Sequence, residues 1–281
     1  MNRKYLCIIV CFIYIFASCS SAPKTPPQSL VVRNEAGRLV ILGAKSLREG
    51  QLAAARDYYM EAYRLYTLVD DTEGRIRALD GLGRVPELDF NAWQKAQEIA
   101  NFVEDQGLVA LAALLKAEEL LFSGEAGSLD QAKNILAQAI TSLGNRPSDK
   151  ARGLRLYGSV LKQLERYDDA IAVLKQAIEI DKKNKSFIEL ASDYYITASV
   201  YSKQGDYKAA VNYLKSAIEY DQRAENGSGL GSDYLALGTV YEKSGDLVRA
   251  QQNYEKALDI YTAGRFADKI ESVRAKMQAL R

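Results

Sequence analysis

Histidine is absent from this chain of 281 residues, and cysteine occurs only near its start, as Cys7, Cys11 and Cys19. The body of the chain therefore has no thiol and can form no disulfide framework. Without histidine it also lacks the usual general base near neutral pH and the commonest metal ligand. These absences argue against an enzyme, and we expect no catalytic residue, no metal and no cofactor.

An excess of charge of one sign is also missing. The chain has 37 Lys and Arg residues against 36 Asp and Glu, a formal net charge of +1. Nucleic-acid binding normally requires a clear basic excess or stripe, so we expect no nucleic-acid partner. Apolar residues make up 48% of the sequence and charged residues 26%, which is typical of a folded soluble body.

The sequence also lacks motifs that bind phosphate or perform acid and base catalysis. The run Gly-Ser-Gly-Leu-Gly at 227–231 contains no lysine and follows a predicted helix, so we interpret it as a turn between repeats. Adjacent acids such as Asp168 and Asp169 point in different directions on a helix, whereas acid and base catalysis needs two carboxylates across a cleft.

The first nineteen residues have the pattern of an export signal. Arg3 and Lys4 precede an apolar run over residues 5–16, which is shorter than the roughly 20 residues that span a membrane. The following Phe-Ala-Ser-Cys, ending at Cys19, resembles the bacterial lipobox, although Phe16 replaces the usual leucine. The resemblance implies a signal peptide over 1–18 and a lipidated Cys19. The alternative is ordinary cleavage after Ala22, which would release a soluble protein.

Residues 19–33 contain Pro23, Pro26 and Pro27, a composition that predicts a flexible tether after the lipidated cysteine. By resemblance to lipoproteins, Ser20 after Cys19 implies sorting to the outer membrane. The implied address is the bacterial cell envelope, with the protein facing the periplasm and contacting the membrane through its lipid anchor.

From residue 34 onward the apolar pattern is helical, and a small residue recurs in each second helix at steps of 36 to 41 residues. These small residues are Ala55, Ala96, Ala132, Ala170, Ala210 and Ala250. The pattern predicts an all-α array of six helix pairs over 34–263. A C-terminal helix over 264–281 would cap the last pair.

The predicted helices follow from this register. By residue number the pairs are 35–48 with 51–68, 73–82 with 91–103, 108–122 with a helix beginning at 128, 150–164 with 167–181, 186–203 with 207–223, and 232–243 with 247–261. We expect Ser128 to cap its helix, with Gln131 reaching back as a capping box.

Small and large residues alternate in a fixed order in the last three pairs. The positions are Leu154, Gly158, Leu161, Ala170, Leu174 and Ala177, then Tyr194, Ala198, Tyr201, Gly205, Ala210, Leu214 and Ala217, then Tyr234, Gly238, Tyr241, Gly245, Ala250, Tyr254 and Ala257. This order resembles the tetratricopeptide repeat, and pairs one and three also fit it. The resemblance implies a right-handed α-solenoid. Its best copies run to 40 residues instead of 34, which predicts longer helices.

Tyrosines form stripes at helical spacing, with Tyr59, Tyr63 and Tyr66 in the first pair and Tyr194, Tyr195 and Tyr201 in the fifth. We interpret such a stripe as packing between repeats. Tyr195 is the better functional candidate, because its neighbour already occupies the packing position.

In the tetratricopeptide family the first helix of each pair lines a concave groove, and side chains offset from the packing positions face into it. This resemblance selects Arg152, Arg155, Lys162, Tyr195, Ser199, Lys203, Thr239 and Lys243, with Ser159, Ser192, Ser232 and Leu235 as neighbours. The groove would be polar and mildly basic, suited to acidic side chains or backbone carbonyls of a bound segment. The alternative is a solvated face. The family's clamp for free C-termini is disfavoured, because Leu156, Ile196 and Ala236 stand where it requires asparagine.

These observations predict a lipid-anchored scaffold or accessory protein that binds other envelope proteins or peptides, and its oligomeric state is left open. An alternative, also by resemblance, is the lipoprotein component of a periplasmic uptake system for hydrophobic ligands. An enclosed apolar channel, or oligomers around a pore, would favour that alternative.

Overall fold

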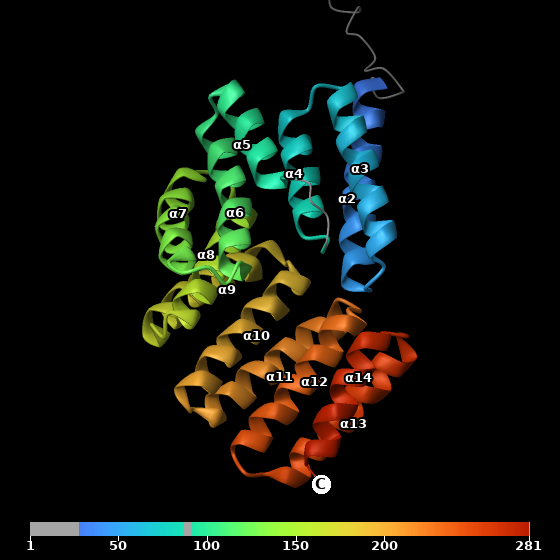
Figure 1. Cartoon of the computed structure of the whole chain (residues 1–281), viewed down its shortest axis with the longest axis vertical. Helices are drawn as coiled ribbons and strands as arrows, with labels where there is room; N and C mark the ends of the chain where they lie inside the picture. Colours follow the sequence, from blue (N-terminus) through green and yellow to red (C-terminus); the bar gives the residue numbers. More distant parts are fainter. Residues whose placement is uncertain (1–27, 87–90, 281) are drawn as a thin grey trace, which may run out of the picture.

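The computed structural model describes residues 28–86 and 91–280, which form thirteen helices and no strand (Figure 1). The signal peptide, Cys19 and the tether up to residue 27 lie outside this range. The helices are α2 (Gln28–Arg48), α3 (Leu52–Leu68), α4 (Thr72–Gly83), α5 (Ala92–Val103), α6 (Gln106–Phe122), α7 (Ser128–Ser142), α8 (Pro147–Gln163), α9 (Tyr167–Asn184), α10 (Phe187–Gln204), α11 (Tyr207–Arg223), α12 (Gly227–Lys243), α13 (Leu247–Ala263) and α14 (Ala267–Ala279).

The helices form six pairs and a terminal helix, which confirms the predicted all-α solenoid. Each first helix packs against its own partner and also touches the next first helix, as α6 touches α4 and α8. The second helices pack mainly against neighbouring first helices. Because the first helices converge, they form the concave side of the array.

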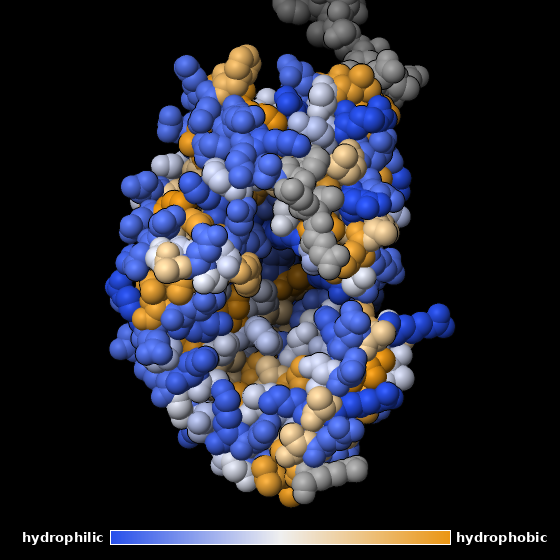
Figure 2. All heavy atoms as spheres, in the orientation of Figure 1, coloured by the Kyte–Doolittle hydropathy of each residue, from blue (hydrophilic) through white to orange (hydrophobic). Residues whose placement is uncertain are grey.

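The array curves back toward its own start. In Figure 1 the chain descends through α8 and α9 and returns through α10 to α13, so that the α11–α12 connection lies below the end of α2. Arg48, the last residue of α2, interacts electrostatically with Asp221 in the last turn of α11. The C-terminal ends of these two helices therefore lie near each other. Figure 2 shows this face hollowed near its centre, with hydrophilic residues around the rim.

Aromatic rings of second helices fit over glycines of first helices. A Cβ atom on Gly238 would lie 2.5 Å from the ring of the fully buried Tyr254, and one on Gly81 would lie 2.1 Å from the ring of Tyr59. Such spacing leaves no room for a side chain, so the glycines allow the two helices to approach closely. The packing interpretation of the Tyr59 stripe agrees with this burial.

The glycine-rich run at 227–231 is the first turn and a half of α12, and its interpretation as a turn between repeats was wrong. Asn226 caps the helix by accepting a hydrogen bond from the Gly229 amide at 3.4 Å. A Cβ atom on Gly229 would lie 2.1 Å from a carboxyl oxygen of Asp221, and one on Gly231 would lie 2.3 Å from the ring of Tyr261. Close packing explains these glycines.

Other helix starts also differ from the sequence prediction. Ser128 does not cap α7, because Gly127 takes that position with a left-handed φ of 78° and Ser128 is buried in the first turn. Pro147 begins α8, where its fixed φ suits the first helical position. Helix α2 begins at Gln28, so residues 28–33 of the predicted tether are helical.

Within the described residues, none of the helices has the length and apolar character that crossing a membrane requires.

Changing Gly238 to Ala is expected to lower the free energy of unfolding by about 1–3 kcal/mol, because the added methyl overlaps the Tyr254 ring. The matched control is Gly227→Ala, at a helical position with no other atom within 4 Å of the new Cβ. It should be neutral or stabilising by less than about 1 kcal/mol. Urea unfolding followed by circular dichroism measures both, and equal effects would contradict this packing account.

Candidate functional site

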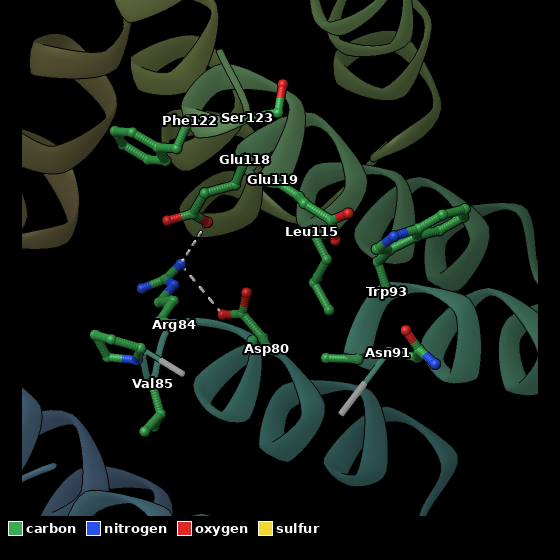
Figure 3. Close-up of a pocket in the computed structure, with 13 residues that line it drawn as sticks. Asp80, Arg84, Val85, Asn91, Trp93, Leu115, Glu118, Glu119, Phe122 and Ser123 are labelled. Atoms are coloured by element: carbon green, nitrogen blue, oxygen red, sulfur yellow. Dashed lines mark hydrogen bonds and ion pairs between the residues drawn. The ribbon is translucent and has the colours of Figure 1, made fainter. Parts of the chain in front are cut away.

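Arg152, a predicted groove residue on α8, is held by an ion network that joins three first helices. Its guanidinium lies 2.6 Å from Oδ1 of Asp80 on α4 and 2.6 Å from Oε2 of Glu118 on α6. Arg84 lies between the same two carboxylates, as Figure 3 shows. Burial would raise the pKa of Asp80, but Arg152 and Arg84 hold it below its ordinary value. Arg152 therefore stabilises the array.

A second network links α4 directly to α8. Arg77 lies 2.9 Å from Oδ2 of Asp149, and Arg146 lies 2.9 Å from Oε1 of Glu73. The intervening helix α6 has Gly107 at this level, where a Cβ atom would lie 3.0 Å from Nε of Arg146. The charged groups of the concave side in this half of the array are thus largely paired with one another.

A cavity of about 750 Å³ lies beside the Arg84 network (Figure 3). Its walls include the apolar side chains of Trp93, Leu115 and Phe122. They also include charged residues, namely Asp80, Arg84, Glu118 and Glu119. The cavity is therefore mixed in character, unlike an enclosed apolar channel.

Arg155, the second predicted arginine, bridges two buried carboxyl groups. Its NH2 group lies 2.6 Å from Oδ2 of Asp181 on α9, and its Nε lies 2.6 Å from Oδ1 of Asp193 on α10. Burial raises the pKa of both carboxyls, that of Asp193 to about 7, although Arg155 opposes the rise. Only 15% of the Arg155 side chain is exposed, so this residue is also committed to the fold.

A second carboxyl pair, which was not predicted from the sequence, occurs forty residues later. Asp221 on α11 and Asp233 on α12 are both buried, but Tyr195 stands where the preceding repeat has Arg155. Asn226 donates a hydrogen bond to Oδ1 of Asp221 at 2.9 Å. Among the described residues, Oδ2 of Asp233 has no hydrogen-bond donor. The only available signal was the forty-residue register of the four aspartates.

Burial raises the pKa values of this pair, and no bridging cation among the described residues opposes the rise. Burial raises the pKa of Asp221 to about 6, although its hydrogen bonds oppose the rise. Burial and the nearby charge of Asp221 raise the pKa of Asp233 to about 9. At neutral pH the two groups therefore hold one proton between them, and they can hydrogen-bond to each other only when they share it.

A basic pocket of about 290 Å³ lies between α10, α12 and α14. Its lining contains five of the predicted groove residues, namely Tyr195, Ser199, Lys203, Thr239 and Lys243. Ser202 and the α14 residues Ser272 and Lys276 add polar groups, and the apolar lining is Ala198, Leu214, Leu235, Ala236 and Val240. The structure thus brings these five residues together, while Arg152 and Arg155 lie in the ion pairs described above.

The lysines of the pocket differ in their partners. Lys276 lies 3.6 Å from Glu242, whereas Lys203 and Lys243 are exposed and form no ion pair in the described part of the chain. At the edge, Lys162 donates a hydrogen bond to Oγ of Ser199 at 3.3 Å. Burial, and then the charge of Lys203, lowers the pKa of Lys162. The pocket therefore offers ammonium and hydroxyl groups suited to a carboxylate.

Thr239 is fixed in position by contacts within its own repeat. Its hydroxyl donates to the Leu235 carbonyl at 3.0 Å and lies 3.2 Å from the Tyr254 hydroxyl. Tyr254 in turn donates to Glu242 at 2.5 Å. Residues 28–86 and 91–280 contain no group of three or more His, Cys, Asp or Glu side chains that could hold a metal ion.

Two models of the tetratricopeptide-repeat family match the chain, one over residues 152–184 and the other over residues 192–263. The first match contains most of α8 and α9, and the second contains most of α10 and all of α11 to α13. The basic pocket and both carboxyl pairs lie largely within these matched residues.

Several solved structures have a similar fold. A Rap protein complexed with competence and sporulation factor shares 15% identity at a TM-score of 0.60, covering 88% of this chain and 71% of that one. The apo form of RapI shares 12% identity at a TM-score of 0.58, covering 89% of this chain and 87% of that one. BtubC (BKLC) from P. vanneervenii shares 18% identity at a TM-score of 0.50, covering 85% of this chain and 92% of that one. These likenesses show the fold alone. No curated protein sequence matches the chain.

Stability should fall as the pH rises, because the pKa of Asp233 in the folded protein, about 9, exceeds its ordinary value of 3.8. Between these values the folded state binds more protons than the unfolded state. The isosteric change Asp233→Asn should remove this dependence, so that from pH 6 to 9 the natural protein loses at least about 1 kcal/mol more than the variant.

Urea unfolding at a series of pH values measures the effect, with the exposed Asp259 changed to Asn as the matched control. Parallel stability curves for the natural protein and the Asp233→Asn variant would show that Asp233 ionises in the ordinary range.

Proposed function

Because the chain is a tetratricopeptide-repeat protein, we propose that it is a scaffold that binds an acidic segment of a protein partner in its basic concave pocket. Repeats of this family are generally non-catalytic scaffolds. The observation that carries the proposal is the pair of exposed lysines, Lys203 and Lys243, which have no ion-pair partner in the described chain.

The chemistry of the pocket suits a carboxylate side chain. The ammonium groups provide charge, and hydroxyls such as that of Ser199 provide further hydrogen bonds. Apolar side chains, including Leu214 and Leu235, can contact the stem of a bound residue. The concave curvature of the first helices is compatible with an extended segment or a helix as the bound element. The similar Rap structure holds competence and sporulation factor, so an array of this fold does accommodate a ligand.

The proposed location is the bacterial cell envelope. The resemblance of residues 16–19 to a lipobox supports lipidation of Cys19, and Ser20 supports outer-membrane sorting. An anchor there would hold the repeat array facing the periplasm, where its partner would be another envelope protein or peptide.

Carriage of a hydrophobic ligand has less support. The cavity beside Arg84 contains four charged residues, and the pocket between α10 and α12 contains three lysines. An apolar ligand in either site would remove charged groups from water and offer them neither a hydrogen bond nor an opposite charge. Both linings favour a polar or charged partner.

Reversing the two unpaired charges, as Lys203→Glu with Lys243→Glu, should reduce recovery of a cross-linked partner from cells at least about tenfold. The partner is cross-linked in intact cells, recovered with the tagged full chain and quantified by mass spectrometry. The matched control is Lys208→Glu with Lys215→Glu, which makes the same charge change on exposed positions of the second helix α11. Equal recovery by the two double variants would contradict the pocket assignment.

Changing Cys19 to Ala should abolish labelling by a radioactive fatty acid and release the protein from membranes, because the acceptor thiol is lost. Cys11→Ala is the control, since that residue lies within the apolar run of the signal. Lipid labelling that persists in Cys19→Ala would overturn the anchor without affecting the pocket.

A further inference from the structure

The repeat formed by α8 to α10 shows what a buried carboxyl pair of this array binds. Asp181 and Asp193 lie on consecutive helices, and the Arg155 guanidinium contacts one oxygen of each at 2.6 Å. The arginine comes from the preceding first helix, α8, and reaches across the concave side. Two carboxylates on a planar guanidinium give charge-assisted hydrogen bonds, a geometry that arginine suits better than lysine.

The next repeat reproduces the two acids without the arginine. Asp221 and Asp233 occupy the same positions forty residues later, and Tyr195 occupies the position of Arg155. A tyrosine hydroxyl carries no positive charge. The Asp233 side chain is 2% exposed, and among the described residues its Oδ2 has no hydrogen-bond donor. Oδ2 of Asp193 has none either, but Arg155 holds Oδ1 of Asp193, whereas no ion pair within the described residues reaches Asp233. The acid pair is thus retained where its cation is not.

Among residues 28–86 and 91–280, one cation acts electrostatically on the pair. Asn226 donates to Asp221, and Tyr195 and Tyr261 interact electrostatically with Asp233. Arg48, at the end of α2, interacts electrostatically with Asp221, but it forms no ion pair in the described structure. Within the described part of the chain, no cation therefore occupies the bridging position that Arg155 takes in the preceding repeat.

We propose that the carboxyl pair of Asp221 and Asp233 binds an arginine side chain of the protein partner, beside Tyr195. This rests on the proposed function, in which the concave side receives the partner. Tyr195 is 36% exposed and lines the basic pocket, so it stands between the groove and the acid pair. The arriving guanidinium displaces the tyrosine ring toward the groove, where the ring can lie against the cation.

The two subsites together define the chemistry of the bound segment. Asp233 and Lys243 lie ten residues apart on α12, which is about 15 Å along a helix axis. An extended segment covers that distance in about four to five residues. The partner segment would therefore carry an arginine and an acidic residue about that far apart, each facing a group of opposite charge.

The experiment is a titration of the full-length protein with N-acetyl-arginine amide, followed by the NMR signals of carbon-13-labelled tyrosine rings. The Tyr195 signal is assigned by its loss in Tyr195→Phe. N-acetyl-citrulline amide, which is similar in shape but uncharged, should bind at least tenfold more weakly. The double variant Asp221→Asn with Asp233→Asn should lose the arginine-dependent shift. Equal binding of the two probes, or an unchanged double variant, would overturn the proposal.

Tyr195→Arg gives a second test that does not depend on a destabilising change. It should supply the missing cation from the chain itself, as Arg155 does, and so raise the melting temperature while abolishing binding of the arginine probe. A variant that still binds the probe would contradict the proposed position of the guanidinium.

Arg48→Ala separates a partner arginine from one of this chain. Binding of the probe should persist in this variant and should not weaken, because Arg48 is a cation that acts on Asp221. If binding appears only when Arg48 is removed, the pair holds Arg48 and the proposal is wrong. The double variant Lys203→Glu with Lys243→Glu should still bind the arginine probe, so failure of the basic pocket and failure of the acid pair can be told apart.

Discussion

The close packing of second helices against first helices is the constraint on which the rest of this structure depends. A helix pair cannot bury its apolar face alone, so the array must stack, and the stacking distance is set where large rings meet glycine. The ring of Tyr254 over Gly238 and that of Tyr59 over Gly81 leave no space for a side chain. This close packing brings polar groups of successive first helices within hydrogen-bonding distance on the concave side.

The charged groups of the concave side divide into two classes as a result. In the first half of the array, arginines such as Arg77 and Arg152 join carboxylates of other helices and hold the curvature. In the second half the pairing is incomplete, since Lys203 and Lys243 form no ion pair in the described chain. Buried carboxylates without a cation are costly, and the pair at Asp221 and Asp233 meets that cost by retaining a proton. We therefore assign partner binding to the basic pocket and to this carboxyl pair, where charged groups have no ion-pair partner within the described chain.

The sequence predicted the repeat array because small residues such as Ala210 and Ala250 recur with the period of a helix pair. The resemblance to the tetratricopeptide repeat also selected Lys203 and Lys243 as groove residues, and both line the basic pocket. The sequence did not predict the roles of Arg152 and Arg155, because their carboxylate partners lie on other helices and their contacts depend on packing.

The glycines of α12 were misleading for a related reason. A glycine run normally indicates a turn. Here the rings and carboxyl groups of neighbouring helices leave no room for a side chain, and no local pattern reveals those neighbours. The carboxyl pairs were hidden in the same way. Their forty-residue register is visible in the sequence, but their burial and contact appear only once the helices are packed. The lipid anchor lies outside the described residues and stays a prediction.

Two neighbouring repeats have the same carboxyl pair and differ in whether an arginine of the described chain bridges it. The most direct measurement is a carbon-13 NMR titration of the aspartate carboxyl groups in the unliganded full-length protein. The account predicts that Asp193, bridged by Arg155, titrates near pH 7, and that Asp233 titrates near pH 9. If Asp233 titrates below Asp193, or if both titrate near pH 4, the difference between the repeats does not exist and the account is wrong.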